Sequence, residues 1–180
     1  MWFLIYKKGI ELVPLIHGGH QFENRRSGTE NVPMIYALGN QVERMYYEYE
    51  IADRYISVRG MSDYLLNSIY DLVKEENIEV YLNGDLVDRL PNNLSLTFKG
   101  INAEQLIALL NEKGITISAG SACCSGEKTP SRILKAIGLS DEEAFSTVRI
   151  SLSHDTTFEE CDKFVEVLGK CLRSLKMMEE

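Results

Sequence analysis

The chain has 180 residues, 44% of them hydrophobic, which suits one globular domain with part of a second attached. Its formal net charge of −8 argues against binding to nucleic acid or to an anionic membrane surface. The first apolar run is far too short to span a bilayer, and four cysteines without a disulfide framework indicate a reducing, cytoplasmic location.

The first 31 residues predict a strand followed by a long loop. Residues 1–6 are wholly apolar, as in a strand that is buried on both faces of a sheet. Residues 12–31 show no periodicity, and loops of this length are often functional. This loop contains guanidinium and hydroxyl groups of the kind that hold a phosphate, at Arg25, Arg26, Ser27 and Thr29. An ordinary polar loop with surface arginines is the alternative.

Helical periodicity follows from residue 32 to about residue 75. Asn31 can cap the first helix, whose apolar positions recur at spacings of three and four, at Ile35, Leu38, Val42 and Met45. A second apolar stripe comprises Leu65, Leu66, Ile69, Leu72 and Val73. An interruption at Gly60, between the two helices, is allowed by the pattern but is not required by it. A helical connection of this length is suited to joining two domains.

Strands and helices alternate in the remaining residues, which predicts an α/β arrangement. Strands are expected at residues 78–82, 94–98, 115–118 and 147–152, and helices at residues 103–112, 132–137 and from 157 onward. The helix starts are marked by capping pairs, at Asn102 with Gln105, Ser140 with Glu143 and Thr157 with Glu160. Cys161 and Cys171 lie on the apolar stripe of the last helix, so we expect them to be core residues.

Two features of this second part can carry chemistry. Residues 118–131 place Cys123 and Cys124 among small residues and glycines, a pattern that favours an accessible, reactive thiol over a buried structural one; a bland surface loop is the alternative. Arg149 lies on a predicted strand, where its guanidinium can bind a carboxylate by two parallel hydrogen bonds, or simply face solvent. No Cys-x-x-Cys pattern or histidine spacing supports a metal site, so we expect none.

Three stretches in this order resemble the C-terminal half of cysteine desulfurases of the NifS/IscS type, which are class V aminotransferase relatives and fold type I pyridoxal-phosphate enzymes. The first is Pro14-Leu-Ile-His-Gly-Gly-His-Gln together with Arg26-Ser-Gly-Thr-Glu-Asn-Val-Pro, and the second is Arg89-Leu-Pro-Asn-Asn. The third begins at Ser118-Ala-Gly-Ser-Ala-Cys and continues to Val148-Arg-Ile-Ser-Leu. The resemblance covers essentially the whole chain, and the loop after Cys123 is similar to the longer version found in this group.

The resemblance assigns roles to four residues. Cys123 matches the cysteine that takes the substrate sulfur as a persulfide, and Arg149 matches the arginine that binds the carboxylate of L-cysteine. Thr29 matches the threonine that reaches the cofactor phosphate of the other subunit in the family's homodimer, and Arg26 belongs to the same cofactor-binding loop. Three positions depart from the family pattern, which are Cys124, His20 and His154.

The family's Schiff-base lysine has no match here, because Lys7 and Lys8 follow the strand that this lysine should precede. The resemblance therefore implies that residues 1–45 are a remnant of the large pyridoxal-phosphate domain, comprising a strand, the phosphate and dimer loop, and the start of the helical connection. Residues 46–180 would be the small C-terminal α/β domain that carries the cysteine loop. Alone, the chain is not expected to complete the reaction.

The expected function is thus the C-terminal part of a cysteine desulfurase, which converts L-cysteine to L-alanine and passes the persulfide sulfur to an acceptor or iron–sulfur scaffold protein. A non-enzymatic persulfide relay, or a partner-binding and dimerisation module, is the alternative. A redox pair of Cys123 and Cys124 ranks last, because a disulfide between adjacent cysteines is strained.

Overall fold

The structure, a computed structural model, describes residues 4–47, 50–119 and 129–179. The chain divides into two compact units, Met1–Ile51 and Ala52–Glu180, and each is treated by itself below. This division falls a few residues after the boundary expected between residues 45 and 46. The derivation of the first segment from a large cofactor-binding domain stays a prediction.

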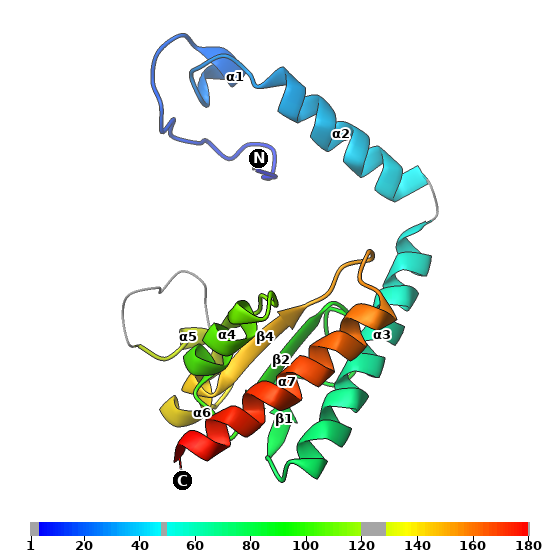
Figure 1. The fold of residues 1–180 in the computed structure, drawn as a ribbon. Coiled ribbons are helices and arrows are strands. Elements are labelled where there is room, and N and C mark those ends of the chain that lie inside the picture. Colours follow the sequence, from blue (N-terminus) through cyan, green and yellow to red (C-terminus); the bar gives the residue numbers. More distant parts are fainter. Residues whose placement is uncertain (1–3, 48–49, 120–128, 180) are drawn as a thin grey trace. The chain divides into compact units, whose positions relative to one another are not determined.

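The first unit consists of an extended segment, a short helical turn α1 (Gln21–Asn24) and the helix α2 (Val32–Tyr47) (Figure 1). The strand predicted over residues 1–6 is wrong for its described part, because residues 4–6 form no strand and Leu4 and Ile5 are 69% and 84% exposed. A strand buried on both faces needs neighbouring strands to satisfy its backbone, and the described residues of this unit supply none.

Helix α2 forms where its periodicity predicts, and the Asn31 side chain accepts a hydrogen bond from the amide of Met34 at 3.3 Å. Its large apolar side chains are nevertheless exposed, among them Val32, Ile35, Val42 and Met45. The sequence therefore forms an amphipathic helix whose apolar positions are not covered by the described residues of its own unit.

The described part of the second unit contains an antiparallel sheet of four strands in the order β1-β2-β4-β3 (Figure 1). Its strands are β1 (Val80–Leu82), β2 (Asn93–Phe98), β3 (Ser118–Ala119) and β4 (Thr147–Ser151). Strand β3 begins three residues later than predicted. In the central pair, Leu94 lies opposite Ile150, and Ser95 lies opposite Arg149.

The hydrophobic core lies on one face of this sheet. Alternate residues of β2 and β4 point into it and are buried, with Leu96 and Phe98 fully so. The helices that contribute to it are α3 (Glu50–Glu75), α4 (Ala103–Glu112) and α7 (Phe158–Glu179). Cys161 and Cys171 of α7 are free and buried in this cluster, which confirms the prediction that both are core residues. Gly60 lies within α3 and does not interrupt it.

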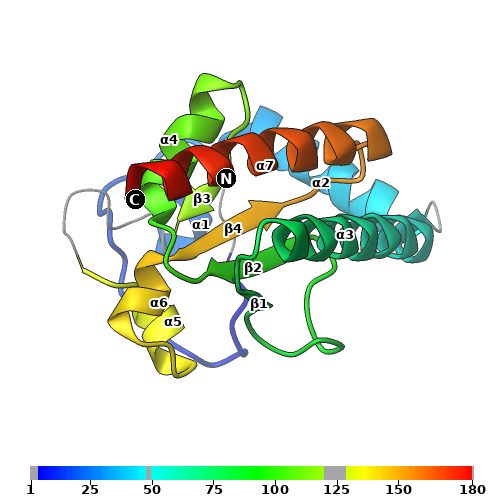
Figure 2. The same cartoon turned by 60° about the horizontal axis from the view of Figure 1, so that its bottom comes forward.

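Two short helices, α5 (Arg132–Ala136) and α6 (Asp141–Phe145), lie on the side of the sheet away from α7 (Figure 2). The predicted capping box of α6 is present, since Ser140 and Glu143 each accept a hydrogen bond from the other's backbone amide. The tyrosine hydroxyl of β1 residue Tyr81 also donates to Glu143 at 2.7 Å, which fastens α6 to the sheet.

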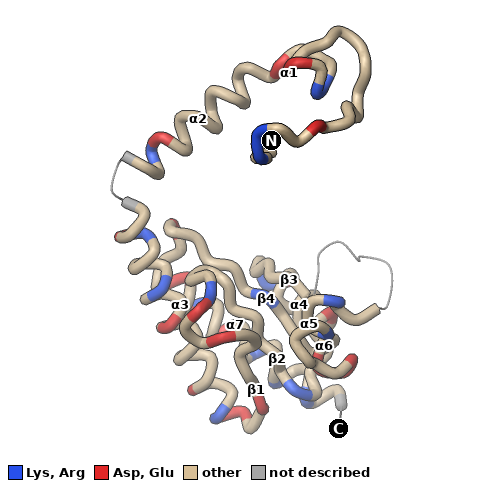
Figure 3. The backbone as a smooth tube through the Cα atoms, turned by 180° about the vertical axis from the view of Figure 1, so that it is seen from behind, with Lys and Arg blue, Asp and Glu red and all other residues tan. Residues whose placement is uncertain are grey.

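Basic and acidic positions of the second unit are spread over several of its helices and loops (Figure 3). None of the described helices is both long enough and apolar enough to cross a membrane.

Candidate functional site

The face of the sheet opposite the core is polar, and the alternation of strand residues explains why. In β2, Leu94, Leu96 and Phe98 take the core side, so Asn93, Ser95 and Thr97 take the other. The same alternation in β4 places Thr147, Arg149 and Ser151 on the polar side. Because both strands are central, their polar residues meet in the middle of the sheet.

A chain of hydrogen bonds runs across this face. The amide nitrogen of buried Asn83 donates to the hydroxyl of Thr97 at 2.9 Å, and the hydroxyl oxygens of Thr97 and Thr147 lie 2.7 Å apart. The Thr147 hydroxyl donates in turn to the backbone carbonyl of Glu143 at 2.6 Å. The chain therefore links the turn after β1, both central strands and α6, and it satisfies groups that would otherwise be buried without partners.

Beside this network lies a pocket of about 220 Å³ that contains Arg149. Its walls come from the turn after β1, from β2 and β4, and from α5, and they comprise Asn83, Gly84, Asn93, Ser95, Ser131, Ile133, Leu134, Ile137, Thr147, Val148 and Arg149. Pockets for drug-sized ligands measure roughly 300–1,000 Å³, so this one suits a smaller molecule. Arg149 is the one charged residue among the described residues of its lining, which favours an anion.

The side chain of Arg149 is half-buried, and no described residue makes a hydrogen bond or an ion pair with its guanidinium. Five N–H donors in a fixed planar arrangement are thus open to a ligand, and a carboxylate matches that arrangement with two parallel hydrogen bonds. This geometry supports the carboxylate-binding role that the sequence suggested over a solvent-facing arginine. The role itself stays a prediction.

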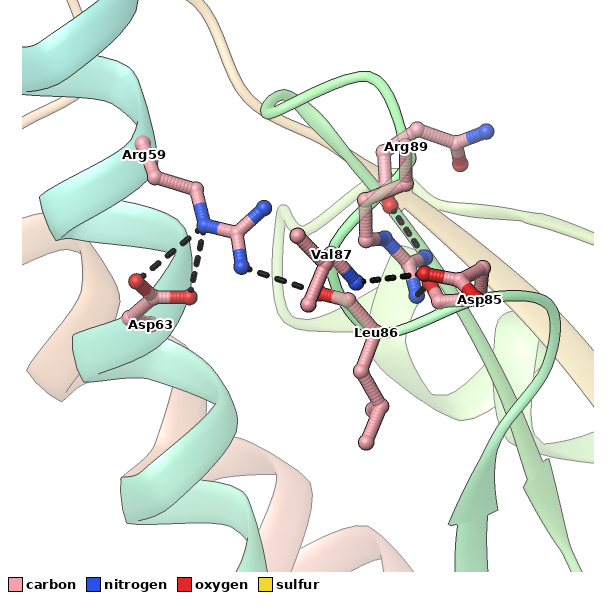
Figure 4. Close-up of polar contacts among 7 residues, drawn as sticks. Arg59, Asp63, Asp85, Leu86, Val87 and Arg89 are labelled. Atoms are coloured by element: carbon pink, nitrogen blue, oxygen red, sulfur yellow. Dashed lines mark hydrogen bonds and ion pairs between the residues drawn. The ribbon is translucent and has the colours of Figure 1, made fainter.

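The turn of residues 83–93 contributes Asn83, Gly84 and Asn93 to the pocket lining. Two arginines hold this turn by hydrogen bonds, Arg89 from within it and Arg59 from α3 (Figure 4). Arg89 donates to the backbone carbonyls of Asn93 at 2.7 Å, Asp85 at 3.2 Å and Asn83 at 3.4 Å. Burial, followed by the proximity of Arg59, lowers the pKa of Arg89. Arg59 of α3 donates to the carbonyl of Leu86 at 3.0 Å, so the turn is tied to the helix as well.

The expected nucleophile Cys123 and its neighbour Cys124 lie outside the described residues, but both flanks of their segment are placed. On one side Ser118 pairs with Arg149 in the sheet; on the other side Ser131 lines the Arg149 pocket. The cysteine segment therefore starts and ends beside Arg149. Cys123 is four residues beyond Ala119, and four extended residues span at most about 14 Å.

The expected cofactor residues lie in the first unit. Arg26 is exposed and directs one guanidinium nitrogen to the carbonyl of Ser27 at 3.0 Å, which leaves its other donors open. Thr29 is exposed, and no described residue forms a hydrogen bond with its hydroxyl. Gly28, between them, has a φ of +118°, and a side chain at this position would collide with Arg26. These donors suit a phosphate group, but their role stays a prediction.

A second depression in the second unit, about 350 Å³, is mostly apolar and is lined in part by Cys161, Ile117 and Phe164. Burial raises the pKa of the Cys161 thiol, as it does for Cys171, so neither favours the nucleophilic thiolate. Among the described residues no group of three or more potential metal ligands comes together.

Sequence reasoning missed several residues of the pocket, namely Asn83, Asn93, Ser131 and Thr147. The period-two alternation in β2 and β4 could have placed Asn93 and Thr147 on the face of Arg149. Thr147 lies two residues before Arg149 in β4, and Asn93 lies two residues before Ser95, the β2 residue opposite Arg149. Asn83 and Ser131 carry no such signal, since they join the pocket from a turn and a helix cap that only the fold brings close.

Comparison with known proteins identifies relatives of the whole chain. Residues 13–164 match the family described as Aminotransferase class-V. The chain is 38% identical to a cysteine desulfurase IscS of Methanosarcina thermophila, over 97% of this chain and 42% of that protein.

Solved structures give the same result. A NifS-like protein superposes with a TM-score of 0.78 at 30% identity, covering 94% of this chain and 41% of the other. A protein described as SspA in complex with cysteine is 32% identical, with a TM-score of 0.52 over 83% of this chain and 38% of the other. The chain thus spans about two fifths of the length of these relatives.

Proposed function

Because the chain belongs to the class-V aminotransferase family, we propose that it is the C-terminal part of a cysteine desulfurase, which takes sulfur from L-cysteine and leaves L-alanine. In this proposal the second unit is the small domain of a fold type I enzyme. The first unit is the remnant of its large domain, and the cofactor lysine belongs to protein outside this chain. The observation that carries the proposal is that both flanks of the cysteine segment lie beside Arg149, whose guanidinium has no partner among the described residues.

Arg149 binds the substrate carboxylate and so fixes the position of the rest of the molecule. The Cys123 thiolate attacks the substrate sulfur. A sulfur–sulfur bond forms as the carbon–sulfur bond breaks, and the carbon takes up a proton to give L-alanine. Pyridoxal phosphate, when bound, supplies the electron sink that makes this bond cleavable.

Thr29 and Arg26 supply donors for the phosphate of that cofactor. This assignment is supported by the membership of the chain in the family of the NifS-like and IscS relatives. The proposal further places the protein in the cytoplasm, as part of a homodimer that hands its persulfide sulfur to an acceptor or iron–sulfur scaffold protein.

The test is sulfide release from L-cysteine by the purified chain, supplied with pyridoxal phosphate and a reductant. We expect no rate above free cofactor for the chain alone. A rate should appear when a polypeptide spanning the part of a relative that this chain does not match is added. Cys123→Ala should abolish this rate and Arg149→Gln should raise KM steeply, whereas Cys161→Ala, in the core, serves as the thiol control. A restored rate that survives Cys123→Ala would refute the assigned nucleophile.

A second candidate is a non-enzymatic module that relays a persulfide or binds a partner. The exposed apolar side chains of α2, including Val32, Ile35 and Val42, favour it, because they offer a surface for another protein. In that case no added polypeptide restores sulfide release, and the chain accepts sulfur on Cys123 from a small persulfide donor, which mass spectrometry detects.

A further inference from the structure

Asn93 stands out among the pocket residues that the proposed reaction does not use. It lines the Arg149 pocket, and its side-chain oxygen is buried without a hydrogen-bond partner in the part of the chain that the structure describes. Buried polar atoms in proteins are nearly always paired, so the amide of Asn93, unlike most, is not held by the surrounding described residues.

Asn93 is placed to act together with Arg149. The register sets Asn93 opposite Ser151 and Ser95 opposite Arg149, so Asn93 and Arg149 are diagonal neighbours on one face of the sheet. Such neighbours have β-carbons roughly 7–8 Å apart, within reach of one small ligand that contacts both side chains. The backbone of Asn93 is also fixed, because its carbonyl accepts a hydrogen bond from Arg89 at 2.7 Å.

The two ends of the Asn93 amide differ in their surroundings. The oxygen is the buried end. The nitrogen is not among the buried unpaired atoms, and no described residue accepts a hydrogen bond from it, so its N–H groups have no partner in the described part of the chain. Beside a cationic guanidinium, a neutral donor of this kind complements an anion with more than one acceptor, as a carboxylate is.

We propose that Asn93 is a second carboxylate-positioning residue, whose amide N–H donates to a carboxylate that Arg149 binds. This rests on the proposed function, since it takes the ligand to be a small α-amino acid. The two donors on neighbouring strands hold the carboxylate from two directions, which orients the amino acid as well as binding it. The pocket thereby selects for small carboxylates over amines that lack this group.

The experiment compares L-cysteine with cysteamine, which has the same amine and thiol but no carboxylate. Each is titrated into the reduced chain, and binding is followed by amide chemical shifts. Asn93→Asp sets a negative charge against the carboxylate, and Asn93→Ala removes the donor; each should weaken L-cysteine binding by roughly tenfold or more, and the neutral Asn93→Ala should leave that of cysteamine unchanged. Asn92→Asp is the matched control, because Asn92 is exposed and lies outside the pocket lining.

The outcomes separate this inference from the function on which it rests. If Arg149→Gln weakens L-cysteine binding but both Asn93 variants bind it as the unchanged chain does, the role of Asn93 is wrong and that of Arg149 stands. If the unchanged chain binds L-cysteine no better than cysteamine, the pocket is not a carboxylate site and both roles fall. If Asn92→Asp weakens L-cysteine binding as much as Asn93→Asp does, the effect comes from the added negative charge alone, and the inference is overturned.

Discussion

Replacing Thr97 with valine removes the hydroxyl at the centre of the hydrogen-bonded chain that crosses the polar face of the sheet. Thr97 is fully buried, and its hydroxyl accepts from Asn83 at 2.9 Å and lies 2.7 Å from that of Thr147. Valine keeps the shape of the side chain, so packing changes little. The hydrogen bonds are therefore what the substitution tests.

The expected loss of stability follows from the hydrogen-bonding groups that the substitution leaves without a partner. Asn83 keeps a longer hydrogen bond to Ser95 at 3.2 Å, but Thr147 loses the partner on its accepting side while still donating to the carbonyl of Glu143. A hydrogen bond contributes about 0.5–1.5 kcal/mol net, and a buried polar group left unpaired costs about 1–3 kcal/mol. We expect Thr97→Val to lower the free energy of unfolding by about 2–3 kcal/mol.

Equilibrium unfolding in urea, followed by circular dichroism, measures this loss. Ser95→Ala is the control, because it removes one longer hydrogen bond from a half-buried residue and should cost only about 0.5 kcal/mol. Thr97→Val combined with Thr147→Val should cost less than the sum of the two, since both remove the same hydrogen bond. A Thr97→Val chain within about 0.5 kcal/mol of the original, at an unchanged denaturant slope, would refute the reasoning.

Four further predictions concern pH, packing and helix capping. Hydrogen bonds from Tyr81 and from the Ser140 amide lower the pKa of Glu143 from 4.5 to about 2, so the stability they provide is complete above pH 4.5 and is lost as the pH falls towards 2. Glu143→Gln should flatten the acid limb of a pH–stability curve over that range, and an unchanged limb would contradict the assignment. Burial, together with the hydrogen bond to Glu143, raises the pKa of Tyr81 from 10.0 to about 12, so its contribution holds below pH 10 and is lost as the pH rises through 12; a spectroscopic phenol titration that places Tyr81 near 10 would disagree. Leu106→Ala should cost about 2–5 kcal/mol in urea unfolding, because Leu106 is fully buried, and a loss below 1 kcal/mol would mean that this part of the core collapses around the cavity. Asn102→Ala should cost about 1 kcal/mol, since Asn102 accepts hydrogen bonds from the amides of Glu104 and Gln105; an unaltered stability would show that water caps this helix equally well.

Local signals predicted much of the second unit. Helix α4 spans the predicted residues, because Asn102 caps it and the apolar spacing of its residues defines one buried side. Strand β2 follows from the alternation of Leu94, Leu96 and Phe98 with polar residues. Each of these signals is contained within a few neighbouring residues, so it can be read before the fold is known.

The N-terminal strand shows where such signals fail. An apolar run is compatible with a buried strand only if neighbouring strands pair with it, and the described residues of the first unit provide none. The helix α2 makes the same point, since its periodicity predicted a helix correctly but not that Ile35 and Val42 would be exposed. Periodicity describes the side chains, whereas burial depends on what packs against them.

The sequence by itself determined the capped helices, the two central strands and the order of motifs that relates Arg149 to the cysteine segment. Only the tertiary structure decided that Asn93, Ser131 and Arg149 share one pocket and that Arg89 donates a hydrogen bond to the backbone carbonyl of Asn93. The reason is physical. Caps and periodicity act between residues a few positions apart, but the pocket forms when antiparallel pairing sets Ser95 against Arg149 across more than fifty residues of chain, and that register is chosen by the packing of the whole core.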